Sequence, residues 1–329
     1  MTNRRQFVQA LGGAAALGAL HPLAALAQAV QQAKIYYGFP AGSAGDSVAR
    51  RVAEKLGDTP YSKINAVVEN KPGAGGRIAL DTLKGSPADG SVLCLAQASA
   101  LSTYPHIYTK LSYSLADFAP VSIGAVMTHG LAVGPMVPAS VKTLKDYIAW
   151  AKANPGQASY GSPGAGSTPH FLGALLGLNT GTDLRHVPYR GSLPAINDVV
   201  GGQIASSMTP VGDYLPFAKA GKLRVLATSG AQRAAYLPDV PTFTEQGFPE
   251  IVADEWFGFF APAKTPAAVI ATASTAIQAA LKDKAVAEGL LSVGLVAHGS
   301  SPEDMKKSLQ SEYERWGPLV KKIGFTAES

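Results

Sequence analysis

The chain has a single cysteine, Cys94, among its 329 residues, so no intrachain disulfide can form. Cys94 lies in the apolar run SVLCLAQ, which predicts a buried core thiol. Charged residues make up only 16% of the chain and hydrophobic residues 47%, a balance that excludes disorder. The length suits one large domain or two of ordinary size.

Several sequence motifs are also missing. Neither Gly-x-x-x-x-Gly-Lys-Ser/Thr nor Gly-x-Gly-x-x-Gly occurs, so a nucleotide site is not expected. No run of Lys and Arg with interleaved aromatics stands out, so the pI of about 9.1 indicates no nucleic-acid partner. No cluster of His, Cys or acidic residues has zinc spacing, and neither a metal nor a cofactor is expected. Apart from His21 in the N-terminal segment, the histidines are scattered along the sequence at His106, His129, His170, His186 and His298.

The serine-hydrolase motif Gly-x-Ser-x-Gly is absent as well. Ser43 has Ala41 where the first glycine should stand, and Ser162 has Tyr160. Asp46 lies at an expected helix start, where a carboxylate is interpreted as a cap and not as a general base. No catalytic residue is assigned, and the chain is not expected to be an enzyme.

The first 29 residues have the organisation of a secretory signal peptide. Positive charge at 3–7 precedes an apolar stretch at 8–20, and small residues offer a cleavage site after Ala27 or Ala29. The apolar stretch is shorter than the roughly 20 residues of a membrane-spanning helix, and His21-Pro22 interrupts it. The pair Arg4-Arg5 favours twin-arginine export, although such pairs also occur in Sec signals. We therefore expect a periplasmic protein.

Cleavage would remove two arginines and no acid, so the formal net charge would fall from +5 to +3. This weakly basic balance favours encounter with anions.

After the signal, short apolar runs alternate with helical patterns, which is typical of an α/β protein. Strands are expected at 33–39, 64–69, 92–96, 158–161, 183–187, 223–229 and 254–261, and helices at 46–56, 76–84, 169–178, 192–200, 266–282 and 302–323. A further helix begins after Thr143, a capping residue with Asp146 three positions later. The order suggests a chain that leaves one domain near 126–134, builds a second and returns, with a hinge of two connections.

Two turns rich in Gly, Ser and Pro each follow an expected strand and precede an expected helix: YGFPAGSAGD at 37–46 and YGSPGAGSTP at 160–169. Small residues let the backbone approach a ligand, and a helix start favours an anion. In the second turn Ser167 or Thr168 is the expected cap, with Pro169 at the first helical position. A carboxylate needs fewer donors than a phosphate, so the two turns predict a site for a small acid. The alternative is that both are ordinary capped turns that bind nothing.

Two further residues have open interpretations. Arg190 follows an expected strand and can pair a carboxylate bidentately, but such an arginine is more often a solvated loop residue. His170, just inside a helix start, is interpreted as a structural hydrogen-bond donor.

Together these motifs resemble those of the Bug-type extracytoplasmic solute receptors of tripartite tricarboxylate transport systems. The resemblance covers almost the whole mature chain in order. It rests on YGFPAGSAGDSVARRVAEKL, VVENKPGAGGRIALDTL, SPADGSVLCLAQ, YGSPGAGSTPH, HVPYRGSLPAINDVVGGQI, AGKLRVLATSG, LPDVPTFTEQGFP and EWFGFFAPAKTP.

The resemblance implies a type II-like, two-domain periplasmic binding protein, with two mixed sheets flanked by helices and a cleft between the domains. Residues 30–128 plus 254–329 would form domain 1, and 129–253 domain 2. It also implies a monomer that closes on a carboxylate and delivers it to the membrane permease subunits of such a transporter. The rival interpretations are a sensory receptor with a membrane signalling partner and an exported hydrolase.

Carried onto this sequence, the family's ligand loops fall on both turns. The implied ligand-binding residues are Phe39, Ala41, Ser43, Gly45, Asp46, Gln97 and Ala98 in domain 1, and Ser162, Gly166, Ser167, His170, Tyr189, Arg190, Thr209 and Asp213 in domain 2.

Some positions depart from the family pattern. Gly45 stands where many members have Thr, Ala165 stands where Asn is frequent, and SSMTPVGD at 206–213 replaces a segment of Phe-Asp-Asn type. That change should alter what the far end of the pocket recognises. A dicarboxylate, an amino acid, an aromatic acid and an amide all stay open as ligands.

Overall fold

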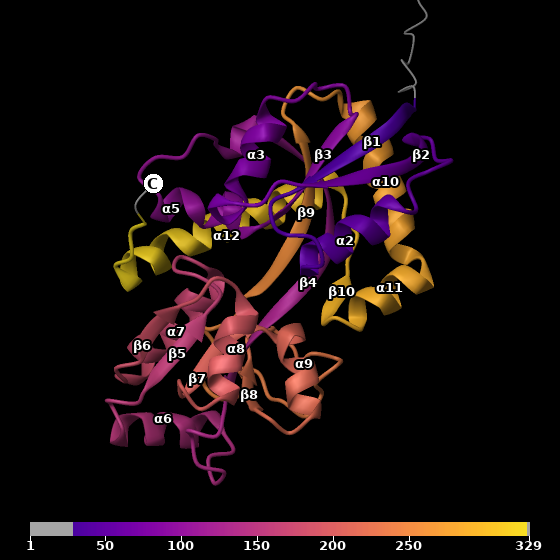
Figure 1. The fold of residues 1–329 in the computed structure, drawn as a ribbon. Helices are drawn as coiled ribbons and strands as arrows, with labels where there is room; N and C mark the ends of the chain where they lie inside the picture. The colour runs from indigo at the N-terminus through magenta and orange to yellow at the C-terminus, as the bar shows by residue number, and fades with distance from the viewer. Residues whose placement is uncertain (1–28, 328–329) are drawn as a thin grey trace, which may run out of the picture.

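The computed structural model describes residues 29–327, so the expected signal peptide, apart from its last residue, lies outside the described residues. Two groups of strands, which we call the first and second sheets, share one long strand (Figure 1). The first sheet has the order β2-β1-β3-β9-β4-β10. Its strands are β1 (Val30–Tyr37), β2 (Ser62–Asn70), β3 (Val92–Gln97), β4 (Phe118–Val133), β9 (Asp254–Pro262) and β10 (Leu295–Ala297).

The second sheet has the order β8-β4-β7-β5-β6 and uses only the end of β4. Its other strands are β5 (Ser159–Ser162), β6 (Arg185–Pro188), β7 (Ser206–Pro210) and β8 (Arg224–Thr228). Both sheets are mixed. β1 runs parallel to β2 and β3, and β5 runs parallel to β6 and β7, whereas β4 pairs antiparallel with each of its neighbours.

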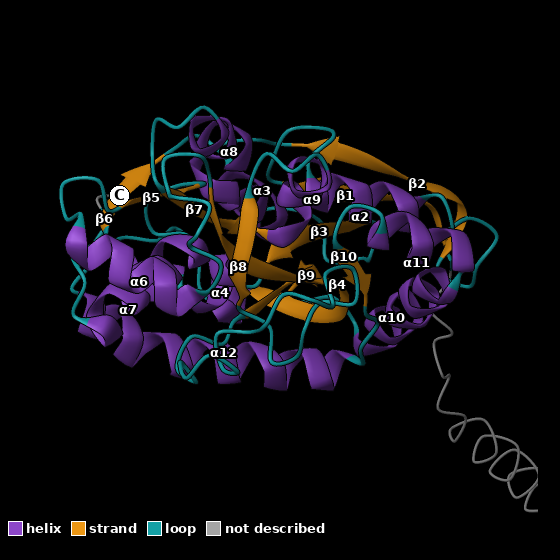
Figure 2. Cartoon of the chain, turned by 90° about the horizontal axis from the view of Figure 1, so that it is seen from below, coloured by secondary structure: helices purple, strands orange, loops and turns teal. Residues whose placement is uncertain are grey.

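Helices flank both sheets, so the predicted α/β class is confirmed (Figure 2). With the first sheet lie α2 (Ala44–Ala53), α3 (Arg77–Lys84), α4 (Ser99–Ser102), α5 (Tyr104–Ile107), α10 (Ala267–Lys282), α11 (Lys284–Leu291) and α12 (Pro302–Ile323), and with the second α6 (Leu144–Ala153), α7 (Thr168–Thr180), α8 (Ser192–Val200) and α9 (Val211–Lys219). Short 3₁₀ turns, η1 (Ala74–Gly76) and η2 (Leu115–Asp117), complete the set.

Strand β4 changes partners along its length. Up to Thr128, which is level with Asp254, it pairs with β9, and from His129, which is level with Pro210, it pairs with β7. The chain returns from the second sheet to the first at the start of β9. β4 and the start of β9 therefore form the strand connection between the two sheets.

Apolar side chains of alternate strand positions fill the space between sheets and helices. One cluster packs between the first sheet and helices α2 and α10, around Ile35, Val48 and Ile277, all fully buried. Another cluster is continuous from the first sheet through α12 to α7 of the second sheet, where the Trp316 and Phe171 rings lie 5.8 Å apart. Helix α12 is therefore a third link between the two sheets, beside β4 and β9.

Local signals account for most of the helices. Thr143 and Asp146 form the predicted capping box of α6, and the expected helices at 192–200 and 302–323 have those bounds. Other expected bounds shift by one to three residues; α10, for example, begins at Ala267, because Pro266 has extended backbone (φ −58°, ψ 139°) and is the N-cap. Cys94 is fully buried, as predicted. Within residues 29–327, no helix combines the length and hydropathy needed to cross a bilayer.

Candidate ligand-binding cleft

A cleft of about 850 Å³ lies between α2, with the turn before it, and α9 of the second sheet. It brings together three of the predicted site residues, Ser43 and Asp46 from one side and Asp213 from the other. Apolar side chains of α8, α9 and the α11–β10 turn line the remainder, among them Leu193, Phe217 and Val293. At one end the two sides touch, because a Cβ on Gly212 would lie 2.2 Å from the carbonyl oxygen of Val293.

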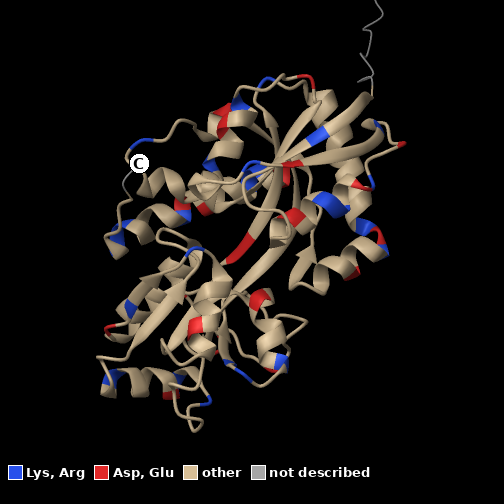
Figure 3. Ribbon diagram, viewed as in Figure 1, with Lys and Arg blue, Asp and Glu red and all other residues tan. Residues whose placement is uncertain are grey.

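Charge in the cleft is mixed. Its lining contains the basic residues Arg50, Arg51, Lys219 and the acidic residues Asp46, Glu54, Asp213. Lys and Arg are likewise interspersed with Asp and Glu over the whole ribbon (Figure 3). Binding of an anion therefore depends on local donors and not on a surface of one sign.

The first turn is built around the carboxylate of Asp46, which is only 2% exposed. Its Oδ2 accepts the Gly42 N–H and the Arg50 Nε–H, both at 2.8 Å, and its Oδ1 accepts the Asn70 Nδ2–H at 2.8 Å. Burial alone would raise the pKa of Asp46, but these three hydrogen bonds outweigh it and hold the pKa below its ordinary value. Asp46 therefore shapes the turn from inside.

Ser43 is the N-cap of α2, and its hydroxyl donates to the Pro40 carbonyl at 2.6 Å. The amides of Ala41 and Ala44 have no protein acceptor among the described residues. Free amides at a helix start are donors for an anion.

The small residue at position 45 has a packing cause. A Cβ on Gly45 would lie 2.3 Å from the Tyr37 hydroxyl, which packs beneath the turn. Phe39 is half-buried, with its ring 5.6 Å from that of Tyr37, so its side chain supports the turn. The glycine at position 45, where many family members have Thr, thus leaves room for the Tyr37 side chain beneath the turn.

Gln97 and Ala98 end β3 beside the first turn, because β1 and β3 are parallel neighbours. Gln97 is half-buried and Ala98 is buried. Ala98 donates its N–H to the Trp256 carbonyl of β9 at 2.9 Å.

The second turn is held by its own polar groups. Ser167 is the N-cap of α7 and accepts the His170 N–H, so Thr168, and not Pro169, is the first helical residue. Gly166 (φ +78°) donates its N–H to His170 Nδ1 at 3.1 Å. That nitrogen is therefore an acceptor, so only Nε2 of the His170 ring can donate, and the interpretation of His170 as a structural donor stays a prediction. A Cβ on Gly166 would lie 2.9 Å from Ile107, so this turn packs against α5 and not on the 850 Å³ cleft.

Two histidines that are scattered in the sequence meet at this turn. The His170 and His186 rings stack with centroids 3.8 Å apart, because β6 is the neighbour of β5 and α7 crosses above them. His186 Nε2 lies 2.8 Å from Ser162 Oγ, and Ser162 is fully buried. Burial lowers the pKa of His170 to about 3, with a further contribution from His186, and lowers the pKa of His186 to about 4.

The remaining predicted residues lie at the ends of β6 and β7. Tyr189 is half-buried and donates its hydroxyl to Asp198 Oδ2 at 2.6 Å, whereas Arg190 is exposed. Thr209 is fully buried. Asp213, in the first turn of α9, is half-buried, and burial raises its pKa despite the nearby Ser192 hydroxyl and His129.

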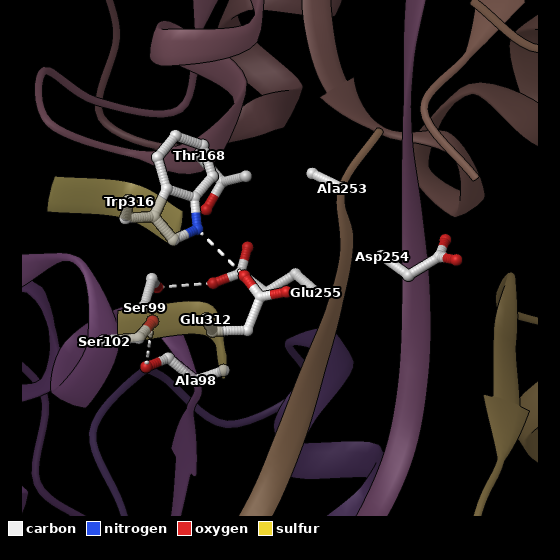
Figure 4. A pocket seen from close by; sticks show the side chains of 9 residues that line it. All are labelled: Ala98, Ser99, Ser102, Thr168, Ala253, Asp254, Glu255, Glu312 and Trp316. Carbon is white, nitrogen blue, oxygen red and sulfur yellow. Dashed lines mark hydrogen bonds between the residues drawn. The ribbon is translucent and has the colours of Figure 1, made fainter. Parts of the chain in front are cut away.

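The structure also places a polar cluster around Glu255 between the two sheets, and no sequence motif predicts this cluster. A small cavity beside it is lined by Ala98, Ser99, Ser102, Thr168, Ala253, Asp254, Glu255, Glu312 and Trp316 (Figure 4). Glu255 is 7% exposed, its Oε1 accepts a hydrogen bond from Ser99 Oγ, and its Oε2 lies 3.1 Å from His129 Nε2. Over residues 29–327, no three His, Cys, Asp or Glu side chains are placed to hold a metal ion.

Comparison with known proteins gives a consistent result. Residues 47–325 match the family model described as tripartite tricarboxylate transporter family receptor. The chain is 34% identical over 291 residues to Protein BugT of Bordetella pertussis, covering 87% of each chain. It is 30% identical to the solved structure of Rpa4515 of R. palustris with adipate, with a TM-score of 0.81 over 91% of this chain and 98% of that one. It is 25% identical to the solved structure of MatC of Rhodopseudomonas palustris with bound malate, with a TM-score of 0.75 over 91% of this chain and 100% of that one.

Proposed function

Because the chain belongs to the tripartite tricarboxylate transporter receptor family, we propose that it is a periplasmic solute-binding protein that captures a small carboxylate between two closing lobes. The lobes are the predicted domains, 30–128 plus 254–329 and 129–253. The change of β4 partners between Thr128 and His129 supports this division, as does the return of the chain at Asp254. The proposed hinge is the strand pair β4 and β9.

One observation supports the proposal: Ala98 of a predicted ligand loop in the first lobe and Thr168, next to the second turn, line the same small cavity between the sheets. In the first sheet, β1 and β3 end at the first turn and at Gln97–Ala98. In the second, the parallel strands β5 and β7 end at the second turn and at Thr209. Ser99, which follows the loop Gln97–Ala98, hydrogen-bonds Glu255, and Thr168, which follows the second turn, lines the cavity beside this carboxylate. Ligands of open α/β sheets bind at such carboxyl ends.

Capture begins with the donors of the first lobe. The free amides at the start of α2 offer one end of an acid a site without a metal or a cofactor. Closure adds contacts from the second lobe, and the ligand shifts the equilibrium only by the difference between its affinities for the open and closed forms. Exclusion of water on closure strengthens the hydrogen bonds to the carboxylate. The bound acid is then delivered to the membrane permease of the transporter.

A thermal-shift panel tests capture. A matching acid at about 100 times its dissociation constant is expected to stabilise the fold by roughly 2.7 kcal/mol, which is a rise in Tm of about 4 °C for a chain of this length. The panel should include adipate and malate, which the two solved relatives bind, together with amino acids and aromatic acids. Adipamide is the matched neutral control for adipate and should give no shift. If no acid in the panel raises Tm, capture of a carboxylate is wrong.

Two rival functions stay distinguishable. A sensory receptor would bind the same acids, but the gene beside it would encode a signalling protein instead of a permease. An exported hydrolase would turn over an ester or amide and lose that activity on Ser43→Ala or Ser162→Ala. Ser162 Oγ does lie 2.8 Å from His186 Nε2, but Ser162 is fully buried, so a substrate carbonyl has no access to it. The geometry therefore favours binding over hydrolysis.

A further inference from the structure

Asp213 is the acidic residue that lines the 850 Å³ cleft from the second lobe. It lies in the first turn of α9, directly after Gly212, which also lines the cleft. In Figure 1 helix α9 lies below α2, and residues of both helices face the same space. The chemistry of Asp213 therefore bears on which ligand the cleft accepts.

A helix cap does not account for Asp213. An acid at the third position of a helix usually accepts the backbone N–H of the N-cap residue, as Asp146 does from Thr143 in α6. The N-cap of α9 is Pro210, which has no N–H to donate. Within residues 29–327, Asp213 accepts no backbone amide and forms no ion pair with Lys or Arg. Its oxygens therefore keep acceptor capacity for a group in the cleft.

The basic residues of the lining do not neutralise Asp213. Arg50 already forms an ion pair at 2.8 Å with the acid one turn earlier in α2. The Arg51 guanidinium lies against α11, since a Cβ on Gly289 would be 2.1 Å from its Nη1. Lys219 is exposed and lies near the other end of α9, about 9 Å further along the helix axis. Burial raises the pKa of Asp213, so its negative charge is incompletely compensated within the protein itself.

Apolar side chains make up much of the remaining lining. Leu193 of α8 is 56% exposed and Val293 of the α11–β10 turn is 42% exposed, and Leu215 and Phe217 of α9 line the same cleft. Exposed apolar side chains that share a cleft favour an apolar ligand chain, because binding removes their surface from water. The cleft thus offers free amides at the start of α2 in one lobe, a carboxylate in the other, and apolar surface besides.

We propose that the ligand is a zwitterion, in which an apolar chain joins a carboxylate to an ammonium group, and that Asp213 is the residue that selects it. The start of α2 holds the carboxylate, and Asp213 accepts hydrogen bonds from the ammonium group. A chain must separate the two groups, because their partners belong to different lobes. A dicarboxylate of the same length would place its second negative charge against Asp213, which disfavours its binding.

This inference rests on the proposed function, which it narrows from small carboxylates in general to ω-amino acids. Matched pairs of linear acids test the selectivity. The amino acids are 4-aminobutanoate, 5-aminopentanoate and 6-aminohexanoate, and their partners of equal carbon number are succinate, glutarate and adipate. Isothermal titration calorimetry at pH 7 measures each dissociation constant. At the chain length that fits best, we expect the amino acid to bind at least tenfold more tightly than the dicarboxylate.

Variants of Asp213 assign the selectivity to its charge. Asp213→Asn removes the charge and keeps the size, so it should weaken binding of the amino acid about tenfold and leave the dicarboxylate unchanged or tighter. Asp213→Lys should reverse the preference. Asp239→Asn is the matched control, because it changes the net charge equally at an exposed position of the second lobe outside the cleft lining. It should leave both dissociation constants unchanged.

The comparison of the two ligand series in the parent protein keeps the test valid if an Asp213 variant does not fold. The inference is overturned if a dicarboxylate binds the parent protein at least as tightly as the amino acid of equal length. It is also overturned if Asp213→Asn changes neither affinity or weakens both by the same factor. In these cases an acid still binds, so capture of a carboxylate stands. If none of the six compounds binds, the inference is wrong, and the thermal-shift panel decides whether the proposed function is wrong as well.

Discussion

Lowering the pH from 6.5 to 5 is expected to reduce the free energy of unfolding by about 3 kcal/mol, mostly through the stacked pair His170 and His186. Both rings are held neutral in the folded protein, because burial lowers the pKa of His170 to about 3 and that of His186 to about 4. In the unfolded chain both titrate near their ordinary pKa of about 6.5. Protonation therefore favours the unfolded state.

The direction of this effect follows from proton binding. Between pH 6.5 and 4 the unfolded state binds more protons at these two sites than the folded state, so stability rises with pH. The stabilisation is complete above pH 6.5 and is lost as the pH falls toward the folded pKa values. Carboxylates with lowered pKa values, such as Asp46 and Glu255, reduce the free energy of unfolding further only below about pH 4.5. Asp213 and Glu312, whose pKa values are raised by burial, act in the opposite direction, so a histidine variant is needed to assign the effect.

Urea unfolding at pH 7, 6 and 5 measures the effect. His186→Gln removes one titrating ring and leaves a hydrogen-bonding group for Ser162, so it should halve the pH dependence in this interval. His298→Gln, at an exposed position, is the matched control and should leave the pH dependence unchanged. An unchanged slope in His186→Gln would rule out the histidine pair as its source.

The local elements of the fold are predictable because their signals are local. α8 and α12 have the predicted bounds, since Pro302 follows the capping Ser301 and glycines follow both helices. The capping box of Thr143 and Asp146 is confirmed for the same reason. Small residues at the two turns likewise mark helix starts, because close backbone packing excludes larger ones there.

Strand partners and contacts between segments that are distant in the sequence cannot be predicted from local sequence patterns. Nothing in the run at 118–133 shows that β4 belongs to two sheets, because apolar periodicity does not encode a strand's partners. The contact of His170 with His186 depends on β6 lying beside β5. Glu255 stands beside a tryptophan in an apolar strand, and its hydrogen bonds are apparent only once Ser99 and His129 are seen beside it.

Asp46 is the candidate site residue whose loss should cost most. Asp46→Ala leaves the Gly42 amide, the Asn70 amide and the Arg50 guanidinium without their shared acceptor, and we expect a loss of about 3 kcal/mol in the free energy of unfolding. Arg50 is partly exposed and regains water, which keeps the loss from being larger. Asp46→Asn keeps one acceptor oxygen and should lose about half as much. Urea unfolding at pH 7 measures both.

The matched control is Asp146→Ala, at a carboxylate that also accepts two backbone amides but lies in α6, away from the cleft. It should cost clearly less than Asp46→Ala, because it removes only a solvated helix cap. An acid that stabilises the parent protein should stabilise the Asp146→Ala protein equally. It should bind Asp46→Ala at least tenfold more weakly, because the turn that presents the Ala41 and Ala44 amides is no longer held in shape. Equal affinity in the two variants would show that the first turn does not bind the acid.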